Sequence, residues 1–268
     1  MQLRRVLRLP KEHGAWAMLY IPFLLGTLAG SRYSVFLLAI FALLSSVTFL
    51  FIARQSLLDW LVARNRGKSE PSAFCMMCIY TGLSGVFGGV LAFVYQLTWL
   101  ILIASLTIML LVFNSWQVVR RKDRTVVTET IAIIGLTATA PTAYYVCRGE
   151  WNSEGWVLWA LCALYFASSV FYVKLRVHSL NRRRIDLRRQ SWRDCAFYHL
   201  FLLFVLIILN ITSHTNLYML AAFLPVLIRT VWELQRPSTQ ISLKRIGLLE
   251  IGYSLVFLAL VTIGYRGL

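Results

Sequence analysis

The sequence predicts an all-α membrane protein with about nine transmembrane helices and a cytoplasmic N-terminus. Three observations predict it. Of the 268 residues, 59% are hydrophobic and only 14% are charged, whereas soluble globular proteins carry about 25% charged residues. The apolar residues form runs of roughly 20, the length that crosses ~30 Å of hydrocarbon as a helix. Lys and Arg gather in alternate connections between these runs.

Nine apolar runs are long enough to cross a bilayer. In chain order they are 14–31, 34–53, 73–95, 97–118, 127–146, 156–175, 196–213, 215–232 and 243–264. Pro and Gly inside them are compatible with helices, because neighbouring helices satisfy the backbone groups that are freed. The connections from the third to the fourth run and from the seventh to the eighth are very short, which predicts that each pair is antiparallel.

The basic residues predict the orientation. With the N-terminus in the cytoplasm, all 27 Lys and Arg residues except Arg32, Arg148 and Arg266 fall on the cytoplasmic side. The positive-inside rule then places the C-terminus outside. The net charge of +16 therefore attracts anionic lipid headgroups, and we expect membrane lipids as partners and no nucleic acid.

An internal repeat divides the chain. Residues 45–57 (SSVTFLFIARQSL) and 168–180 (SSVFYVKLRVHSL) share Ser-Ser-Val, an Arg and Ser-Leu when each takes one single-residue gap. Both stretches lie at the cytoplasmic end of the second span of a set of four. We therefore expect one integral membrane domain, built from a first four-helix half (1–122), a second four-helix half (123–240) and a ninth helix (241–268). Repeats of this kind place a shared site where the halves meet.

This 4+4+1 arrangement resembles the UbiA superfamily of intramembrane prenyltransferases. That family carries an Asn-Asp-x-x-Asp-x-x-x-Asp motif after the second span and another Asp-rich motif after the sixth, and these carboxylates hold Mg²⁺ and a diphosphate. Here the first motif falls on Gln55 to Asp59, where Asp59 is the only carboxylate, and Ala63 replaces the last Asp.

The second Asp-rich motif is also replaced. After the sixth span stand Lys174, Arg176 and His178, with no carboxylate before Asp186. Magnesium prefers carboxylate and phosphate oxygens, so the resemblance implies the fold without the Mg²⁺ cofactor. Cys75 and Cys78 form a C-x-x-C inside a span without further ligands, so we expect no zinc or other metal site.

A second resemblance covers nearly the whole chain. The segments PKEHGAWAMLYIPFLLG (10–26), ARQSLLDW (53–60), APTAYYV (140–146) and KRIGLLE (244–250) are similar to the hallmarks of the YwiC-like family of bacterial multi-pass membrane proteins. The first segment is the most specific. The resemblance implies residence in the bacterial cell (inner) membrane, and it implies no particular reaction.

Ionisable side chains at the cytoplasmic span ends are the site candidates, because such groups are costly in hydrocarbon. The ligand-binding candidates are Glu12, His13, Arg54, Gln55, Asp59, Glu129, Lys174, Arg176, Arg245 and Glu250, and the candidate acids or bases are His13, His178, His199 and Glu250. The alternative for each residue is structural: Arg and Lys snorkel, and a Glu pairs with an Arg of a neighbouring span. Glu250 lies between apolar segments and needs a dedicated partner or a water-filled cavity.

Two functions fit this layer of charges. In the first, Arg54, Lys174 and Arg176 hold the headgroup of an anionic or isoprenoid-type lipid directly, without Mg²⁺, and a groove between the halves takes the tail. The alternative is a proton-coupled small-solute transporter or a membrane-complex assembly factor. Transporter sites tend to lie near the membrane midplane, so a charged layer at one face favours the lipid site. The sequence predicts neither a specific reaction nor an oligomeric state.

Overall fold

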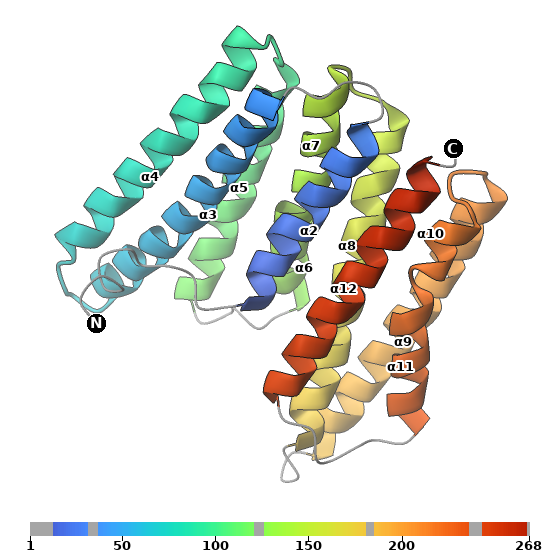
Figure 1. Cartoon of the computed structure of the whole chain (residues 1–268). Helices are drawn as coiled ribbons and strands as arrows, with labels where there is room; N and C mark the ends of the chain where they lie inside the picture. The colour runs from blue at the N-terminus through green and yellow to red at the C-terminus, as the bar shows by residue number, and fades with distance from the viewer. Residues whose placement is uncertain (1–12, 32–36, 121–125, 181–184, 236–242, 267–268) are drawn as a thin grey trace.

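The computed structural model describes residues 13–31, 37–120, 126–180, 185–235 and 243–266. Within these residues every regular element is a helix, and the helices form one elongated bundle (Figure 1). They are α2 (His13–Gly30), α3 (Leu37–Asn65), α4 (Pro71–Gly89), the short π-helix η1 (Val90–Val94), α5 (Trp99–Val119), α6 (Val126–Thr137), α7 (Thr139–Arg148), α8 (Ser153–Leu180), α9 (Ile185–Ile211), α10 (Leu217–Ala221), α11 (Leu224–Gln235) and α12 (Leu243–Arg266).

The helices match the predicted spans. In the described part of the chain, eight helical stretches are long and apolar enough to cross a membrane, and Gly14–Gly30 adds a shorter apolar helix. The fifth span is made of α6 and α7 together, and the eighth of α10 and α11. The predicted class, an all-α multi-pass membrane protein, is confirmed.

Two helices extend well past the predicted apolar runs. Helix α3 continues to Asn65 instead of residue 53, and α9 begins at Ile185 instead of residue 196. Both extensions are rich in Arg, Gln and Leu, which are good helix formers. Hydropathy marks only the part of a helix that lies in hydrocarbon, so the polar turns after the run in α3 and before the run in α9 were missed.

Small residues bring α2 and α7 together at the centre of the bundle. A Cβ added to Gly26 would lie 2.1 Å from the backbone oxygen of Ala140, and one added to Gly30 would lie 2.7 Å from Cβ of Cys147. Membrane helices use such small residues to let backbones approach closely. The first span of each predicted half therefore forms the contact between the halves.

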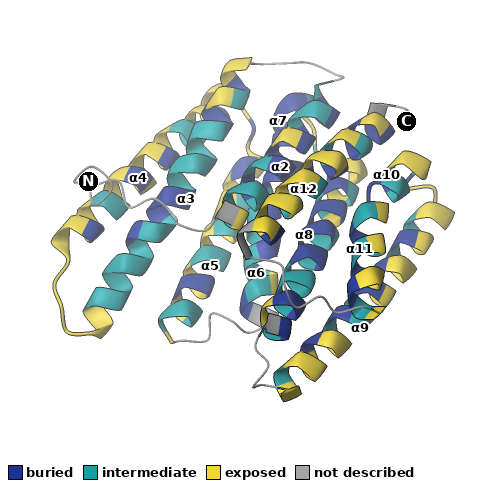
Figure 2. Cartoon of the chain, turned by 60° about the horizontal axis from the view of Figure 1, so that its bottom comes forward, coloured by how far each residue is buried: buried dark blue, intermediate teal, exposed yellow. Residues whose placement is uncertain are grey.

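Apolar side chains cover the outside of the bundle. On α4, α5 and α9 many large apolar residues are exposed, and Figure 2 shows these helices with long exposed stretches. Exposed apolar surface of this extent marks a membrane-facing protein. The buried core is largest in the second half, where the rings of Tyr165 and Phe257 stack with centroids 4.1 Å apart.

One end of the bundle carries nearly all of the described cations. We call it the basic end; it is where α3, α5, α8 and α11 finish and where α12 begins, at the bottom of Figure 1. Among the described Lys and Arg side chains, only Arg148 belongs to the opposite end. Helix α2 starts at the basic end and α12 finishes at the other (Figure 1), as an odd number of spans requires.

Candidate functional site

The structure divides the predicted layer of charges into two groups. Residues two apart on a helix point to different sides, and Lys174 and Arg176 on α8 do so. Lys174 forms an ion pair with Glu129 on α6, whereas Arg176 forms one with Glu233 on α11. The predicted single set of cations is thus split between the contact of the two halves and the interior of the second half.

The first group, which we call the inter-half group, consists of Arg54, Gln55, Asp59, Asn114, Thr128, Glu129 and Lys174. Arg54 on α3 donates from Nη2 to Oδ1 of Asn114 on α5 over 2.9 Å. Asn114 in turn donates from Nδ2 to the backbone oxygen of Thr128 on α6, also over 2.9 Å. The next residue, Glu129, pairs with Lys174 on α8. Two successive residues of α6 therefore connect the second span of the first half with the second span of the second half.

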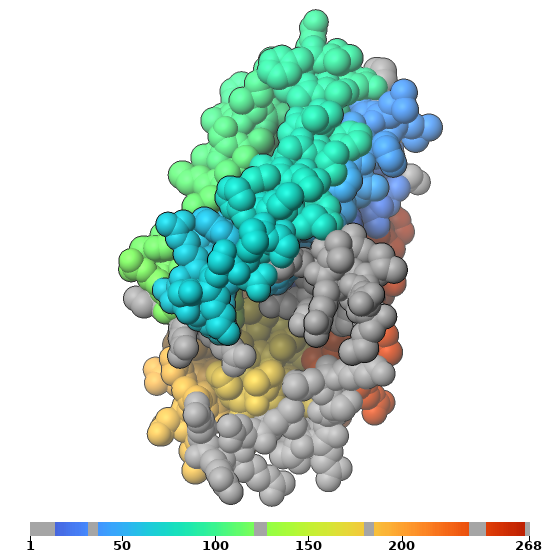
Figure 3. Space-filling model, turned by 90° about the vertical axis from the view of Figure 1, so that its left-hand side faces the viewer, coloured from blue at the N-terminus to red at the C-terminus, as the bar shows by residue number. Residues whose placement is uncertain are grey.

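This group is partly accessible to a ligand. The side chains of Lys174 and Glu129 are 24% and 27% exposed, and those of Arg54, Gln55 and Asp59 are intermediate in burial. Gln55 Nε2 donates to Asp59 Oδ1 over 3.1 Å, one helical turn away. In the space-filling view, surface of α8 lies recessed below the basic ends of α3 and α4 (Figure 3).

Arg54 and Arg176 hold matching positions in the sequence repeat and make matching contacts. Each lies on the second helix of its half and reaches a side chain on the last helix of that half, Asn114 on α5 or Glu233 on α11. The partners differ in charge, since one is a neutral amide and the other a carboxylate. The surroundings differ as well, because the Arg176 side chain is only 1% exposed.

The second group, which we call the second-half cluster, contains two ion pairs. Arg176 pairs with Glu233, whose side chain is 5% exposed, and Arg229 on α11 pairs with Glu250 on α12. Glu250 thus has the dedicated partner that its apolar surroundings required. Buried charges persist in proteins only when they are paired and hydrogen-bonded, so both pairs are suited to fastening α8, α11 and α12 together.

Aromatic rings enclose Arg229. Its guanidinium carbon lies 4.2 Å from the ring centroid of Tyr172 and 5.0 Å from that of Tyr253. Cation–π contacts of this kind are strongest when they are desolvated, and the Arg229 side chain is only 8% exposed. Within the described residues, Nε and Nη2 of Arg229 and Oε2 of Glu250 make no hydrogen bond.

His199 is a buried hydrogen-bonded side chain at mid-height of α9. Its Nδ1 lies 2.8 Å from the backbone oxygen of Cys195, which only accepts, so Nδ1 carries the proton. Its Nε2 lies 2.9 Å from Ser168 Oγ. Thr230 Oγ1 also lies 3.1 Å from Nε2 and donates to the backbone oxygen of Val226. These contacts link α8, α9 and α11.

The remaining predicted candidates lie apart from both groups or outside the described residues. His178 is hydrogen-bonded to Ser191 of α9, and Arg245 is exposed in the first turn of α12. Glu12 lies outside the described residues. His13 begins α2, and its side chain is not described. In the described ranges, no three His, Cys, Asp or Glu side chains form a group that could hold a metal ion.

Four residues of these groups were missing from the sequence-based candidates. Arg229 and Glu233 lie four residues apart on one face of α11, and that i,i+4 spacing at the end of a predicted span was the available signal. Asn114 lies inside the fourth predicted span, where a buried amide also needs a partner. Thr128 takes part through its backbone oxygen, which no side-chain pattern could indicate.

Comparisons with known proteins agree with this architecture. A family model described as YwiC-like protein matches residues 9–144. The uncharacterized protein YwiC of Bacillus subtilis (strain 168) is 26% identical over 251 residues, covering 94% of this chain and 95% of that protein. A solved structure with a similar fold comes from a study of digeranylgeranylglyceryl phosphate synthase in membranes, a UbiA-family prenyltransferase. The superposition has a TM-score of 0.64 at 12% sequence identity, and it covers 99% of this chain and 99% of the other chain. This last likeness shows a shared fold.

Proposed function

The chain belongs to the YwiC-like family, and on that premise we propose that it binds a lipid with an anionic headgroup through the inter-half group. The headgroup is held by Arg54 and Lys174 without Mg²⁺, and the tail is of the isoprenoid type. The tail class is suggested by the UbiA-like fold, because the solved chain with that fold is named for a geranylgeranyl lipid phosphate. We place the protein in the bacterial cell (inner) membrane with its basic end in the cytoplasm.

The observation that carries this proposal is the contrast between the two pairs on α8. A solvent-exposed ion pair contributes about 0–1 kcal/mol, and the partly exposed Lys174–Glu129 pair is closer to that limit than the buried pair, so an incoming oxyanion replaces Glu129 at Lys174 at the lower cost. Breaking a buried pair costs about 3–5 kcal/mol, which keeps Arg176 bound to Glu233. Lys174 is 24% exposed and Arg176 is 1% exposed. We therefore leave Arg176 out of the proposed headgroup site, although the sequence analysis predicted it as a headgroup ligand.

Arg54 completes the proposed headgroup site. Guanidinium donors bind phosphate and carboxylate oxygens in a planar fork. Arg54 donates from Nη2 to the neutral amide of Asn114, and its side chain is only partly buried. The matching contacts of Arg54 and Arg176 also support our inference that the two four-helix halves arose by duplication.

Lipid mass spectrometry of the purified protein tests the proposal. We expect an anionic isoprenoid-type lipid to copurify with the wild type and to be depleted in Lys174→Gln. Arg64→Gln, which changes an exposed cation at the same end of α3, serves as the control and should retain the lipid. Equal lipid content in the wild type and Lys174→Gln would contradict the proposed site.

A second candidate function, proton-coupled transport, is favoured by the depth of the second-half cluster. Glu233 and Glu250 lie toward the basic end, and His199 lies at mid-height of α9. Chains of Glu and His inside a bundle often mark proton pathways. Proton flux into liposomes that contain the protein, with loss of that flux in Glu250→Gln, would favour transport; an intact flux in that variant would exclude the cluster as its path.

A further inference from the structure

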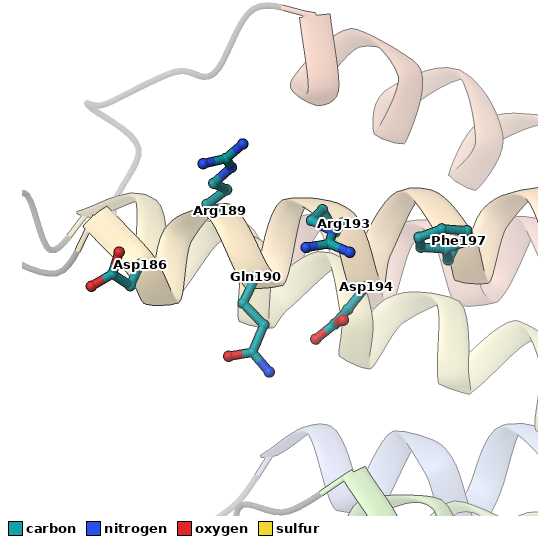
Figure 4. A pocket seen from close by; sticks show the side chains of 6 residues that line it. All are labelled: Asp186, Arg189, Gln190, Arg193, Asp194 and Phe197. Carbon is teal, nitrogen blue, oxygen red and sulfur yellow. The ribbon is translucent and has the colours of Figure 1, made fainter.

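We propose that the outer face of α9 binds a phospholipid whose headgroup carries both a phosphate and a primary amine. This site is separate from the inter-half group and does not depend on the function proposed for it. It begins with a groove along the basic end of α9, lined by Asp186, Arg189, Gln190, Arg193, Asp194 and Phe197 (Figure 4). All six of these side chains come from α9.

The groove continues into an apolar stripe on the same helix. Residues spaced by three or four lie on one helix face, and Phe197, Phe201 and Phe204 follow the groove with this spacing. Their side chains are 67%, 54% and 62% exposed. From Asp186 to Phe197 the helix rises ~16 Å, which is more than the thickness of one headgroup layer, about 5–8 Å. A lipid lying along α9 thus meets polar groups first and aromatic rings next.

The charges in the groove select the headgroup. Arg189 and Arg193 offer guanidinium groups that suit phosphate oxygens, while Asp186 and Asp194 offer carboxylates on the same stretch of helix. A headgroup with negative charge alone would be repelled by the two carboxylates. A primary ammonium satisfies them with its three N–H donors, whereas a quaternary ammonium has no N–H to donate. Phosphatidylethanolamine has this combination of charges.

A contact with α11 holds the groove in place. Trp192, on the same turns of α9, donates from Nε1 to the backbone oxygen of Leu234 over 3.2 Å. Its ring is 45% exposed, as expected for a Trp at the membrane interface. The polar part of α9 is therefore fixed against the bundle, so a lipid binds there without first ordering the helix.

Native mass spectrometry of the full-length protein, titrated with dioleoyl phosphatidylethanolamine, phosphatidylcholine or phosphatidylglycerol, tests this inference. We expect phosphatidylethanolamine to bind about tenfold more tightly than phosphatidylcholine. The double variant Asp186→Asn, Asp194→Asn should lose that preference, and Arg189→Gln, Arg193→Gln should weaken all three lipids. Unchanged thermal unfolding would show that these exposed substitutions leave the fold intact.

A control variant and two contradicting results complete this test. Arg64→Gln removes an exposed cation at the same end of the bundle and should preserve the preference. Equal binding of phosphatidylethanolamine and phosphatidylcholine to the wild type would overturn the proposal. So would tighter binding of phosphatidylglycerol than of phosphatidylethanolamine that is lost in Arg189→Gln, Arg193→Gln, because it would mark a simple anion site on α9.

Discussion

Lys174 and Arg176 lie two residues apart on α8 and pair with carboxylates of different helices, Glu129 on α6 and Glu233 on α11. The first pair lies beside the contact between the halves, next to Thr128, which accepts a hydrogen bond from Asn114 of the first half, and it is partly exposed. The second lies inside the second half and is almost completely buried. The two cations of this motif therefore have different roles: Lys174 belongs to the proposed lipid site, and Arg176 holds α8 and α11 together.

The buried pair should dominate stability. Arg176→Leu leaves Glu233 charged and without its partner, so we expect the free energy of unfolding to fall by about 3–5 kcal/mol. The double variant Arg176→Leu, Glu233→Leu should recover most of that loss, because two apolar side chains can replace a buried pair. Denaturant unfolding of the detergent-solubilised protein measures both. Lys174→Gln is the matched control and should change the value by about 1 kcal/mol or less; an equal loss in the two single variants would be inconsistent with this assignment.

Glu250 should act on stability and not on lipid binding. In Glu250→Gln the guanidinium of Arg229 stays between Tyr172 and Tyr253 but loses its counter-charge, so thermal unfolding should begin at a lower temperature. Lipid copurification should match the wild type, because Glu250 lies in the second-half cluster. Loss of the lipid from a protein that still unfolds cooperatively would move the ligand site into that cluster.

Close packing of the two halves should fail when a methyl group is added at Gly26. The new Cβ would lie 2.1 Å from the backbone oxygen of Ala140, so α2 and α7 must separate. We expect Gly26→Ala to give little folded protein in size-exclusion chromatography. Gly85→Ala on α4 is the control, because a Cβ there meets nothing within 4 Å and Ala favours the helix by up to about 1 kcal/mol. Similar yields of the two variants would show that the α2–α7 contact is looser than described.

The orientation can be tested with reporter fusions. The one-sided distribution of Lys and Arg predicts that the C-terminus lies outside. Alkaline phosphatase fused after Leu268 should be active, and a fluorescent protein inserted between α8 and α9, in residues 181–184, should fluoresce from the cytoplasm. A cytoplasmic C-terminal reporter would require an even number of spans and would reverse the assignment.

The fold class could be predicted from the sequence alone, and so could the requirement that Glu250 has a partner. Runs of apolar residues report directly on hydrocarbon thickness, and a carboxylate between apolar segments must be neutralised wherever it lies. The identity of the partner was not available, because Arg229 is 21 residues away on another helix and only helix packing brings the two together.

The division of the charged residues into two groups could not be predicted either, because it also depends on helix packing. The sequence predicts one depth in the membrane for Lys174, Arg176 and Arg54. The direction of each side chain depends on which helices surround α3 and α8, which the sequence does not show. The i,i+2 spacing of Lys174 and Arg176 was visible, yet its consequence appears only once α6 and α11 are placed on different sides of α8.

Binding of geranylgeranyl monophosphate to the purified protein in the presence of a magnesium chelator tests the central claim most directly. The wild type and Arg64→Gln should bind equally well with and without the chelator. Lys174→Gln and Arg54→Gln should each bind about 10- to 100-fold more weakly, the loss expected for one charge-assisted contact. Loss of binding on chelation, or wild-type affinity in Lys174→Gln, would contradict a metal-free lipid site at the inter-half group.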